Sequence, residues 1–247
     1  MATYVLVHGA AHGGWCYQRV ARILRTAGHD VYAPTMTGLG ERSHLLRPDV
    51  DLDMHIRDMA AVLHYEDLRD VILVGHSYGG MVVTGVADRT AERIGRLVYL
   101  EAATPLNHQS RLDLAGPFAG SDRDAFIEAV AATRRVVDGV ELFLFPEPDG
   151  GRLYGVTDGD DLAWMAERLT AQPWRSFEQP LRLTNEAALW AIPQYHIVCT
   201  STLAMRDTQK VDRARADGRL WDIDTGHDLM ITEPEAVADA LMQVGAT

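Results

Sequence analysis

The segment that most restricts the fold is residues 75–79, which read Gly-His-Ser-Tyr-Gly and match the pattern G-x-S-x-G. It lies between a fully apolar run at 71–74 and a predicted helix from about Met81 to Asp88. On a sharp turn from strand to helix, the serine backbone is strained and its hydroxyl is exposed, while the glycines avoid collisions with neighbouring backbone. We therefore predict that Ser77 is a nucleophile; the alternative is a glycine-rich turn that only joins strand to helix.

Short apolar runs alternate with amphipathic stretches along both ends of the chain. This alternation predicts a parallel sheet that is covered by helices on both faces. The predicted strands are 4–7, 31–33, 71–74, 97–100, 195–199 and 219–223, and the main predicted helices are 15–27, 52–63 and 234–244.

The rhythm changes between residue 104 and about residue 191. Aromatic residues become dense there, and prolines and Asp/Gly turns interrupt short helical stretches. We interpret this stretch as a helical cap inserted into a single domain that spans residues 1–247. Two side chains are expected to line an apolar substrate site: Trp164 in the insertion, and Met230 close to the C-terminus.

A second glycine-rich segment, residues 8–15 (His-Gly-Ala-Ala-His-Gly-Gly-Trp), follows the first predicted strand. Such a loop can direct a backbone N–H at a developing oxyanion, and the residue after the nucleophile supplies the other N–H. We assign these donors to Ala10 and Tyr78, with an uncertainty of one position for Ala10. A dinucleotide-binding loop is disfavoured because G-x-G-x-x-G is absent. His8 and His12 are expected to hydrogen-bond the backbone, so we predict no metal and no cofactor.

The general base is predicted from residues 225–228 (Thr-Gly-His-Asp), which follow the last predicted strand. Histidine is the usual base for a serine nucleophile, and in this type of fold it comes after the serine and the acid in the chain. His227 is the only histidine after that strand.

Taken together, these motifs resemble the plant methylesterase and hydroxynitrile lyase family and its bacterial esterase relatives, within the α/β-hydrolase superfamily. The resemblance also includes residues 197–200 and 161–181, and it covers nearly the whole chain. It implies the α/β-hydrolase fold, a mostly parallel sheet flanked by helices, with the insertion forming a cap over the active site.

The chain departs from this family at the third member of the triad. Plant-type members carry an aspartate two residues after a Cys-Thr pair, and this position is Thr202 here. Glu101 directly follows a predicted strand, at a position where bacterial relatives often have an acid, and we favour it as the partner of His227. Asp207 is the alternative, and Glu101 could instead be satisfied by backbone N–H groups alone.

A second departure concerns lyase chemistry. Plant hydroxynitrile lyases of this type carry a threonine in the oxyanion loop and a lysine after the catalytic histidine, and these positions are Ala10 and Asp228 here. Because an aspartate would repel a developing cyanide, cleavage of cyanohydrins by that mechanism is disfavoured.

The charge composition limits the classes of binding partner that we expect. The 35 acidic and 23 basic residues give a net charge of -12, which argues against nucleic acid or an anionic membrane as a partner. No apolar run is long enough to span a bilayer, and the first predicted strand begins too early for a signal peptide, so we expect a cytoplasmic protein.

We therefore expect a serine hydrolase that cleaves a carboxylic ester or lactone of a small, fairly apolar molecule through an acyl-enzyme. The alternatives are a lyase, a C–C hydrolase or an acyl transferase with the same site, or a ligand receptor that has retained this fold. A homodimer stays open.

Overall fold

The centre of the protein, in a computed structural model of residues 1–247, is a parallel sheet. The structure describes all residues except 115–122 and 206–207. Neighbouring strands in the sheet order β2-β1-β3-β4-β8-β9 all run parallel, which confirms the predicted parallel sheet. The strands are β1 (Thr3–Val7), β2 (Asp30–Tyr32), β3 (Val71–His76), β4 (Ile94–Leu100), β8 (Gln194–Cys199) and β9 (Leu220–Ile223).

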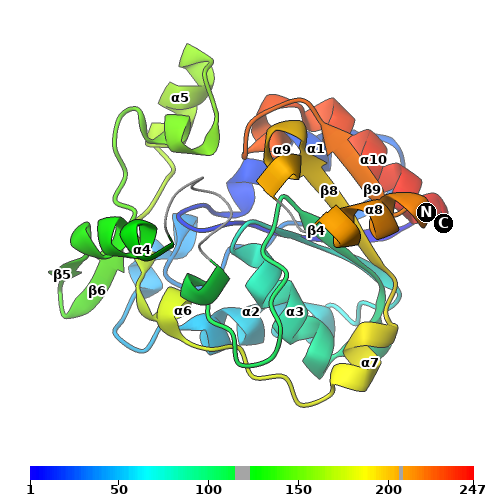
Figure 1. Ribbon diagram of the computed structural model, residues 1–247, viewed down its shortest axis with the longest axis horizontal. Helices are drawn as coiled ribbons and strands as arrows, with labels where there is room; N and C mark the ends of the chain where they lie inside the picture. The colour runs from blue at the N-terminus through cyan, green and yellow to red at the C-terminus, as the bar shows by residue number, and fades with distance from the viewer. Residues whose placement is uncertain (115–122, 206–207) are drawn as a thin grey trace.

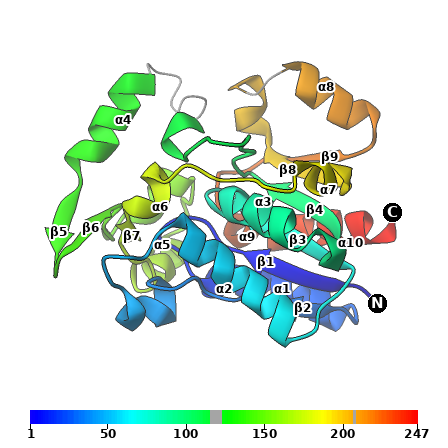
Figure 2. The ribbon, with the colours of Figure 1, turned by 90° about the horizontal axis from the view of Figure 1, so that it is seen from below.

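Helices cover both faces of this sheet (Figures 1 and 2). Alternate residues of a strand point to opposite faces, so Val5 and Val7 belong to one buried cluster while Tyr4 and Leu6 belong to the other. The first cluster is closed by α2 (Leu52–Tyr65) and α3 (Gly79–Arg89), and the second by α1 (Gln18–Thr26) and α10 (Pro234–Ala246). Shorter helices, α8 (Thr208–Ala216) and α9 (Leu229–Thr232), flank β9 in the sequence.

The predicted helix over residues 15–27 is divided in the structure. A 3-10 turn spans Gly14–Tyr17 and α1 follows it. The chain at Gly14 runs so close to the residue after β2 that an added Cβ would lie 1.9 Å from the carbonyl oxygen of Ala33. The predicted end of the helix is confirmed: Gly28 has a φ of 88°, a left-handed conformation that glycine adopts without strain.

Most of the chain between β4 and β8 lies at the left of Figures 1 and 2, but its last helix, residues 186–191, lies at the right. It contains the expected helices and, in addition, a small antiparallel sheet in the order β5-β6-β7. Its helices are α4 (Arg123–Ala132), α5 (Gly159–Ala166), α6 (Arg175–Glu178) and α7 (Glu186–Ala191), and its strands are β5 (Arg135–Val137), β6 (Val140–Phe143) and β7 (Gln172–Pro173). We call residues 104–191 the insertion.

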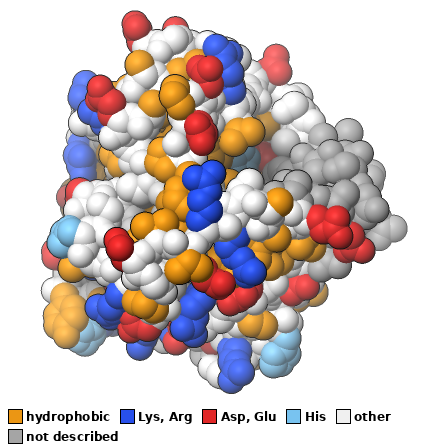
Figure 3. Space-filling model, turned by 90° about the vertical axis from the view of Figure 1, so that its left-hand side faces the viewer, with side chains coloured by type: hydrophobic (Ala, Val, Ile, Leu, Met, Phe, Trp, Pro, Cys, Tyr) orange, Lys and Arg blue, Asp and Glu red, His pale blue; other side chains and the backbone are white. Residues whose placement is uncertain are grey.

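The surface on the insertion side carries hydrophobic side chains across its centre, with Lys or Arg side chains lying among them (Figure 3). Among the described residues, no helix combines the length and the hydropathy that a bilayer span requires.

Candidate active site

Ser77 follows the last residue of β3 and lies two residues before α3. Its φ of 53° is the left-handed conformation expected for a serine on such a turn. The flanking glycines have no room for a side chain: a Cβ on Gly75 would lie 2.7 Å from the carbonyl oxygen of Gly79, and one on Gly79 would lie 2.7 Å from that of Val7. The predicted turn and the steric need for its two glycines are therefore confirmed.

His227 reaches this turn from the loop between β9 and α9. Its Nε2 lies 2.9 Å from the Ser77 Oγ, a hydrogen-bond distance. The ring of His227 lies between two others, with centroids 4.9 Å from that of His76 and 6.3 Å from that of Tyr154. The structure thus brings together the predicted nucleophile and the predicted base, which are separated by 150 residues in the chain.

His76 supports the loop of His227, a role that sequence analysis did not assign. Its Nε2–H donates a hydrogen bond of 3.0 Å to the carbonyl oxygen of His227. Burial, followed by the neighbouring His227, lowers the pKa of His76 to about 3. His76 is therefore a neutral donor at neutral pH.

Glu101 directly follows β4, is fully buried and has a φ of 45°. Its Oε2 accepts hydrogen bonds from the backbone N–H of Cys199 (2.6 Å) and from the Thr202 hydroxyl (3.1 Å). The carboxylate thus lies at the end of β8, against the residue that occupies the family's usual aspartate position. The alternative acid, Asp207, lies outside the described residues.

The two predicted oxyanion donors are the N–H groups of Ala10 and Tyr78. Within the described part of the chain, no hydrogen-bond acceptor occupies either of them. The next N–H along the loop, that of Ala11, donates to the Gln172 Oε1 at 2.8 Å, so it is already used. This distribution favours Ala10 over its neighbour.

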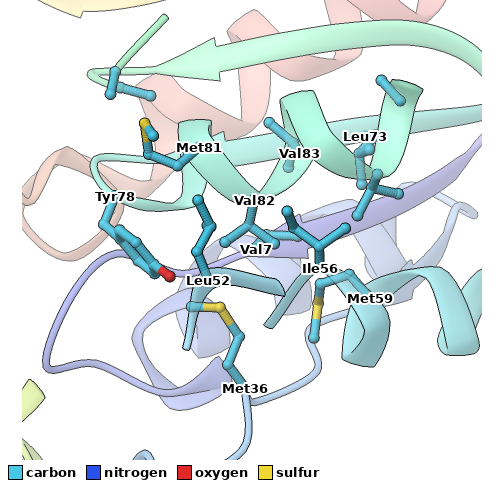
Figure 4. Packing of buried hydrophobic residues seen from close by; sticks show 14 of the residues in the cluster. Val7, Met36, Leu52, Ile56, Met59, Leu73, Tyr78, Met81, Val82 and Val83 are labelled. Carbon is cyan, nitrogen blue, oxygen red and sulfur yellow. The ribbon is translucent and has the colours of Figure 1, made fainter. Parts of the chain in front are cut away.

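The side chain of Tyr78 lies in the hydrophobic cluster, beside Leu52 and Met36 (Figure 4). Its hydroxyl lies 2.9 Å from the His55 Nδ1. Because the His55 Nε2 lies 3.0 Å from the carbonyl oxygen of Thr37, which can only accept, Nε2 carries the proton and Nδ1 accepts from Tyr78. Burial lowers the pKa of His55 to about 4, in keeping with this neutral form.

His12 and Asp228 form a buried pair that sequence analysis missed. The His12 Nδ1 lies 2.7 Å from the carbonyl oxygen of Ala10, and its Nε2 lies 2.8 Å from the Asp228 Oδ2. Burial lowers the pKa of His12, but the charge of Asp228 and the hydrogen bonds to Asp228 and Ala10 outweigh it, and the pKa is raised. Each ring nitrogen of His12 thus faces an oxygen that can accept, and the pair links the oxyanion loop to the residue after His227.

The expectation that the loop histidines bond to the backbone is confirmed for both. His12 bonds to Ala10 as described, and the His8 Nδ1 lies 2.8 Å from the carbonyl oxygen of Gly9. The other His8 nitrogen, Nε2, accepts from the N–H of Met36 at 3.1 Å. Burial lowers the pKa of His8 to about 3.

Three side chains near Ser77 offer possible metal ligands. Atoms of His76, His227 and Asp228 lie within 4.8 Å of one another. However, the His76 Nε2 donates to a carbonyl and the His227 Nε2 faces Ser77. The arrangement therefore suits a hydrogen-bonded serine and histidine better than an ion.

The two side chains expected to line the substrate site differ in their exposure. Met230 has no exposed surface and packs in the cluster under α1 and α10. Trp164 lies edge-on to Trp15, with ring centroids 5.0 Å apart, and is flanked by the guanidinium groups of Arg19 and Arg168. Met230 is therefore inaccessible, whereas Trp164 is only partly buried, and the roles of both in a substrate site stay predictions.

Comparison with known proteins gives one family. The model described as the alpha/beta hydrolase family matches residues 4–240. The chain is 38% identical to a carbendazim hydrolyzing esterase of Nocardioides sp. (strain SG-4G), over 99% of this chain and 100% of the relative. It is 25% identical to methylesterase 2 of Arabidopsis thaliana, over 98% of this chain and 95% of that protein.

Solved structures agree on the fold. An extracellular alpha/beta-hydrolase from a Paenibacillus species superimposes with a TM-score of 0.75 at 21% identity, over 98% of each chain. That protein is described as sharing structural and functional homology with the tobacco salicylic acid binding protein 2.

Proposed function

The chain belongs to the α/β-hydrolase family, and from this premise we propose that it is a serine esterase that forms an acyl-enzyme. The proposed substrate is a carboxylic ester or lactone of a small, fairly apolar molecule. The observation that carries the proposal is the 2.9 Å contact between the Ser77 Oγ and the His227 Nε2 on a strained turn.

In the proposed reaction, the Ser77 Oγ attacks the ester carbonyl carbon while the His227 Nε2 takes its proton. The negative charge that develops on the carbonyl oxygen is stabilised by the N–H groups of Ala10 and Tyr78. When the tetrahedral intermediate collapses, the C–O bond to the leaving alcohol breaks and His227 returns the proton to it. Water, deprotonated by His227, then hydrolyses the acyl-enzyme and releases the acid.

We assign Glu101 the role of the third triad member, which orients His227 and stabilises its protonated form. Support comes from the buried position of its carboxylate at the end of β8, where it contacts Thr202. Glu101, which follows the neighbouring strand β4, would thus take the role of the aspartate that family members carry at the position of Thr202.

Cyanohydrin cleavage is a weaker proposal than ester hydrolysis. Asp228, at the position of the lyase lysine, is buried and its Oδ2 lies 2.8 Å from the His12 Nε2, so this position holds an acid where that mechanism uses a lysine. The residues at the site therefore stabilise an oxyanion, and the similarity to an esterase points the same way.

The proposal is tested by labelling with a fluorophosphonate and by turnover of p-nitrophenyl acetate. We expect one covalent adduct, located at Ser77 by peptide mass spectrometry, and a fall in kcat of at least about 10³-fold in Ser77→Ala. Folded protein that takes no label would refute the proposal. Labelling without turnover on esters, lactones or carbendazim would instead favour a ligand receptor.

A further inference from the structure

We propose that Gln172, in the insertion, is a positioning residue for the oxyanion site. It fixes the peptide that follows the Ala10 N–H, and the segment around it also contacts Tyr78, which supplies the other N–H. The inference rests on the proposed function, and it concerns how the two donors are kept in place.

The insertion binds both polar backbone groups of Ala11. The Ala11 N–H donates to the Gln172 Oε1 at 2.8 Å, and the Ala11 carbonyl oxygen accepts from the N–H of Thr170 at 2.9 Å. Ala11 has a φ of 64°, a left-handed conformation that is unfavourable for a residue with a Cβ. Contacts from the insertion therefore stabilise a loop conformation that alanine does not favour by itself.

The peptide between Ala10 and Ala11 is fixed on its other side as well. Its carbonyl oxygen accepts from the His12 Nδ1–H at 2.7 Å, while its N–H is the group that donates to Gln172. With both ends of this planar unit held, only the two backbone dihedrals of Ala10 separate it from the Ala10 N–H. Loss of the Gln172 contact would free the donor to move.

The same segment of the insertion reaches the second donor residue. The Gln172 Nε2–H donates to the Ser176 Oγ at 2.7 Å. The neighbouring Phe177 ring stacks on the Tyr78 ring, with centroids 5.2 Å apart and planes 17° from parallel. Residues 172–177 therefore contact the two loops that carry the predicted oxyanion donors, Ala10 and Tyr78.

The orientation of the Gln172 amide is determined by its partners. A backbone N–H can only donate, so the atom that faces Ala11 must be the oxygen, and the amide nitrogen must face Ser176. The Ser176 hydroxyl in turn lies 2.6 Å from the carbonyl oxygen of Pro173, to which it donates. Gln172 and Ser176 are both fully buried. No exposed side chain takes part, so the contact is not exchanged for water.

The expected effect is on the transition state. Removal of an oxyanion donor lowers kcat by about 10²- to 10³-fold, and a displaced donor costs less, so Gln172→Leu should lower kcat by about tenfold to hundredfold. KM should change by less than about threefold, because the oxyanion forms only after the substrate is bound.

The test compares Gln172→Leu with Gln179→Leu. Gln179 also belongs to the insertion, and its Oε1 also accepts from a backbone N–H, that of Asp53 at 3.1 Å, but this contact lies at the start of α2. For each variant we would measure kcat and KM on p-nitrophenyl acetate, inhibition by a trifluoromethyl ketone, and unfolding in urea. The ketone reports on the donors directly because its adduct with Ser77 carries an oxyanion.

For Gln172→Leu, we expect kcat/KM and the affinity for the ketone to fall by the same factor. For Gln179→Leu, both should stay within about threefold of the unchanged protein. A folded Gln172→Leu variant that keeps its kcat, or that changes only in KM, would overturn the proposal.

Ser176→Ala is the milder variant, because it keeps the Gln172 side chain and removes the hydroxyl that accepts from its amide and donates to the Pro173 carbonyl oxygen. We expect a fall in kcat of about threefold to tenfold. If Gln172→Leu does not fold, Ser176→Ala becomes the deciding variant, and an unchanged kcat in it would refute the positioning role. If the protein without substitutions shows no ester turnover, the proposed function is refuted as well. If it is active and the Gln172→Leu and Ser176→Ala variants keep its kcat, only the positioning role is refuted.

Discussion

The carboxyl edge of the parallel sheet and the insertion contribute to the candidate site in different ways. The sheet edge carries the groups proposed to react: Ser77 after β3, Glu101 after β4 and His227 after β9. The insertion carries Gln172 and Phe177, which contact the loops of the predicted oxyanion donors. The groups proposed to react thus follow the ends of strands, and the insertion contacts loops that carry the predicted donors.

This difference has a physical basis. Ser77 and Glu101 have similar left-handed backbone conformations, with φ of 53° and 45°, and both follow strands that are paired along their length. Such strain persists where the surrounding structure determines it strongly. The insertion has its own small sheet, and it contacts the rest through buried side chains and through backbone hydrogen bonds such as that from the Thr170 N–H to the Ala11 carbonyl oxygen. Changes at the sheet edge should therefore alter chemistry and stability together, while changes in the insertion should separate them.

The largest expected effect is at Glu101. Glu101→Gln should lower kcat by about 10³- to 10⁴-fold, because the amide cannot stabilise the protonated form of His227. Steady-state kinetics on p-nitrophenyl acetate at matched folding would measure it. A Glu101→Gln variant with full activity would place the acid elsewhere, with Asp207 as the next residue to test.

A second variant tests the same prediction by moving the carboxylate from position 101 to position 202. Because the Thr202 hydroxyl lies 3.1 Å from the Glu101 Oε2, Thr202→Asp in the Glu101→Gln background places a carboxylate close to the one removed. We expect this double variant to recover part of the lost kcat. Thr202→Val is the matched control, and it should lose less than about tenfold.

Acid should destabilise the sheet side of the molecule. Burial lowers the pKa of His8, His55 and His76 to about 3, 4 and 3, so below the ordinary value of 6.5 the unfolded chain binds protons that the native state does not. As the pH falls from 6.5 toward 4, each should reduce the free energy of unfolding by up to about 1.4 kcal/mol per pH unit.

Urea unfolding at pH 7 and pH 5 measures this loss, and His55→Asn should reduce its slope. The opposite sign applies to His12, whose raised pKa contributes stability that is complete below the ordinary pKa and is lost as the pH rises through the native value. A stability independent of pH below 6.5 would contradict the neutral forms assigned to the three buried histidines.

A smaller effect is expected where α3 meets the loop after β4. A Cβ on Gly80 would lie 2.0 Å from the carbonyl oxygen of Ala103, so Gly80→Ala must displace residues 101–103. We expect a loss of about 1–3 kcal/mol in the free energy of unfolding and a fall in kcat, because Glu101 moves with this loop. Gly159→Ala in the insertion is the control, since nothing lies within 4 Å of its Cβ. Equal losses of stability and of kcat in Gly80→Ala and Gly159→Ala would contradict the difference proposed between the sheet edge and the insertion.

The smallest effect concerns backbone conformation alone. Gly139 in the insertion and Gly28 after α1 have φ of 80° and 88°, and an added Cβ would meet nothing within 4 Å at either position. Alanine at each should cost about 1 kcal/mol in the free energy of unfolding, with kcat unchanged. Thermal unfolding and kinetics check this, and a lower kcat in Gly139→Ala would show that the β5–β6 hairpin acts on the site.

That hairpin was also predictable from the sequence, but the aromatic and proline content of the insertion led us to expect helices. Asp138 and Gly139 form a two-residue turn with φ of 50° and 80°, and valines flank it on both sides. An Asp-Gly pair between β-branched residues is a strong hairpin signal. Here the local turn chemistry was a better guide than the overall composition.

The sequence by itself determined the parallel sheet, its main helices, the turn at Ser77 and the histidine after the last strand, because hydrophobic periodicity and close glycine contacts act over a few residues. Only the tertiary structure decided that Glu101 lies against Thr202, that His12 pairs with Asp228 across 216 positions, and that Gln172 binds Ala11 across 161. A buried polar group takes whatever partner the packed elements bring within about 3 Å. No local pattern encodes that meeting, because it is set by how the sheet edge and the insertion pack together.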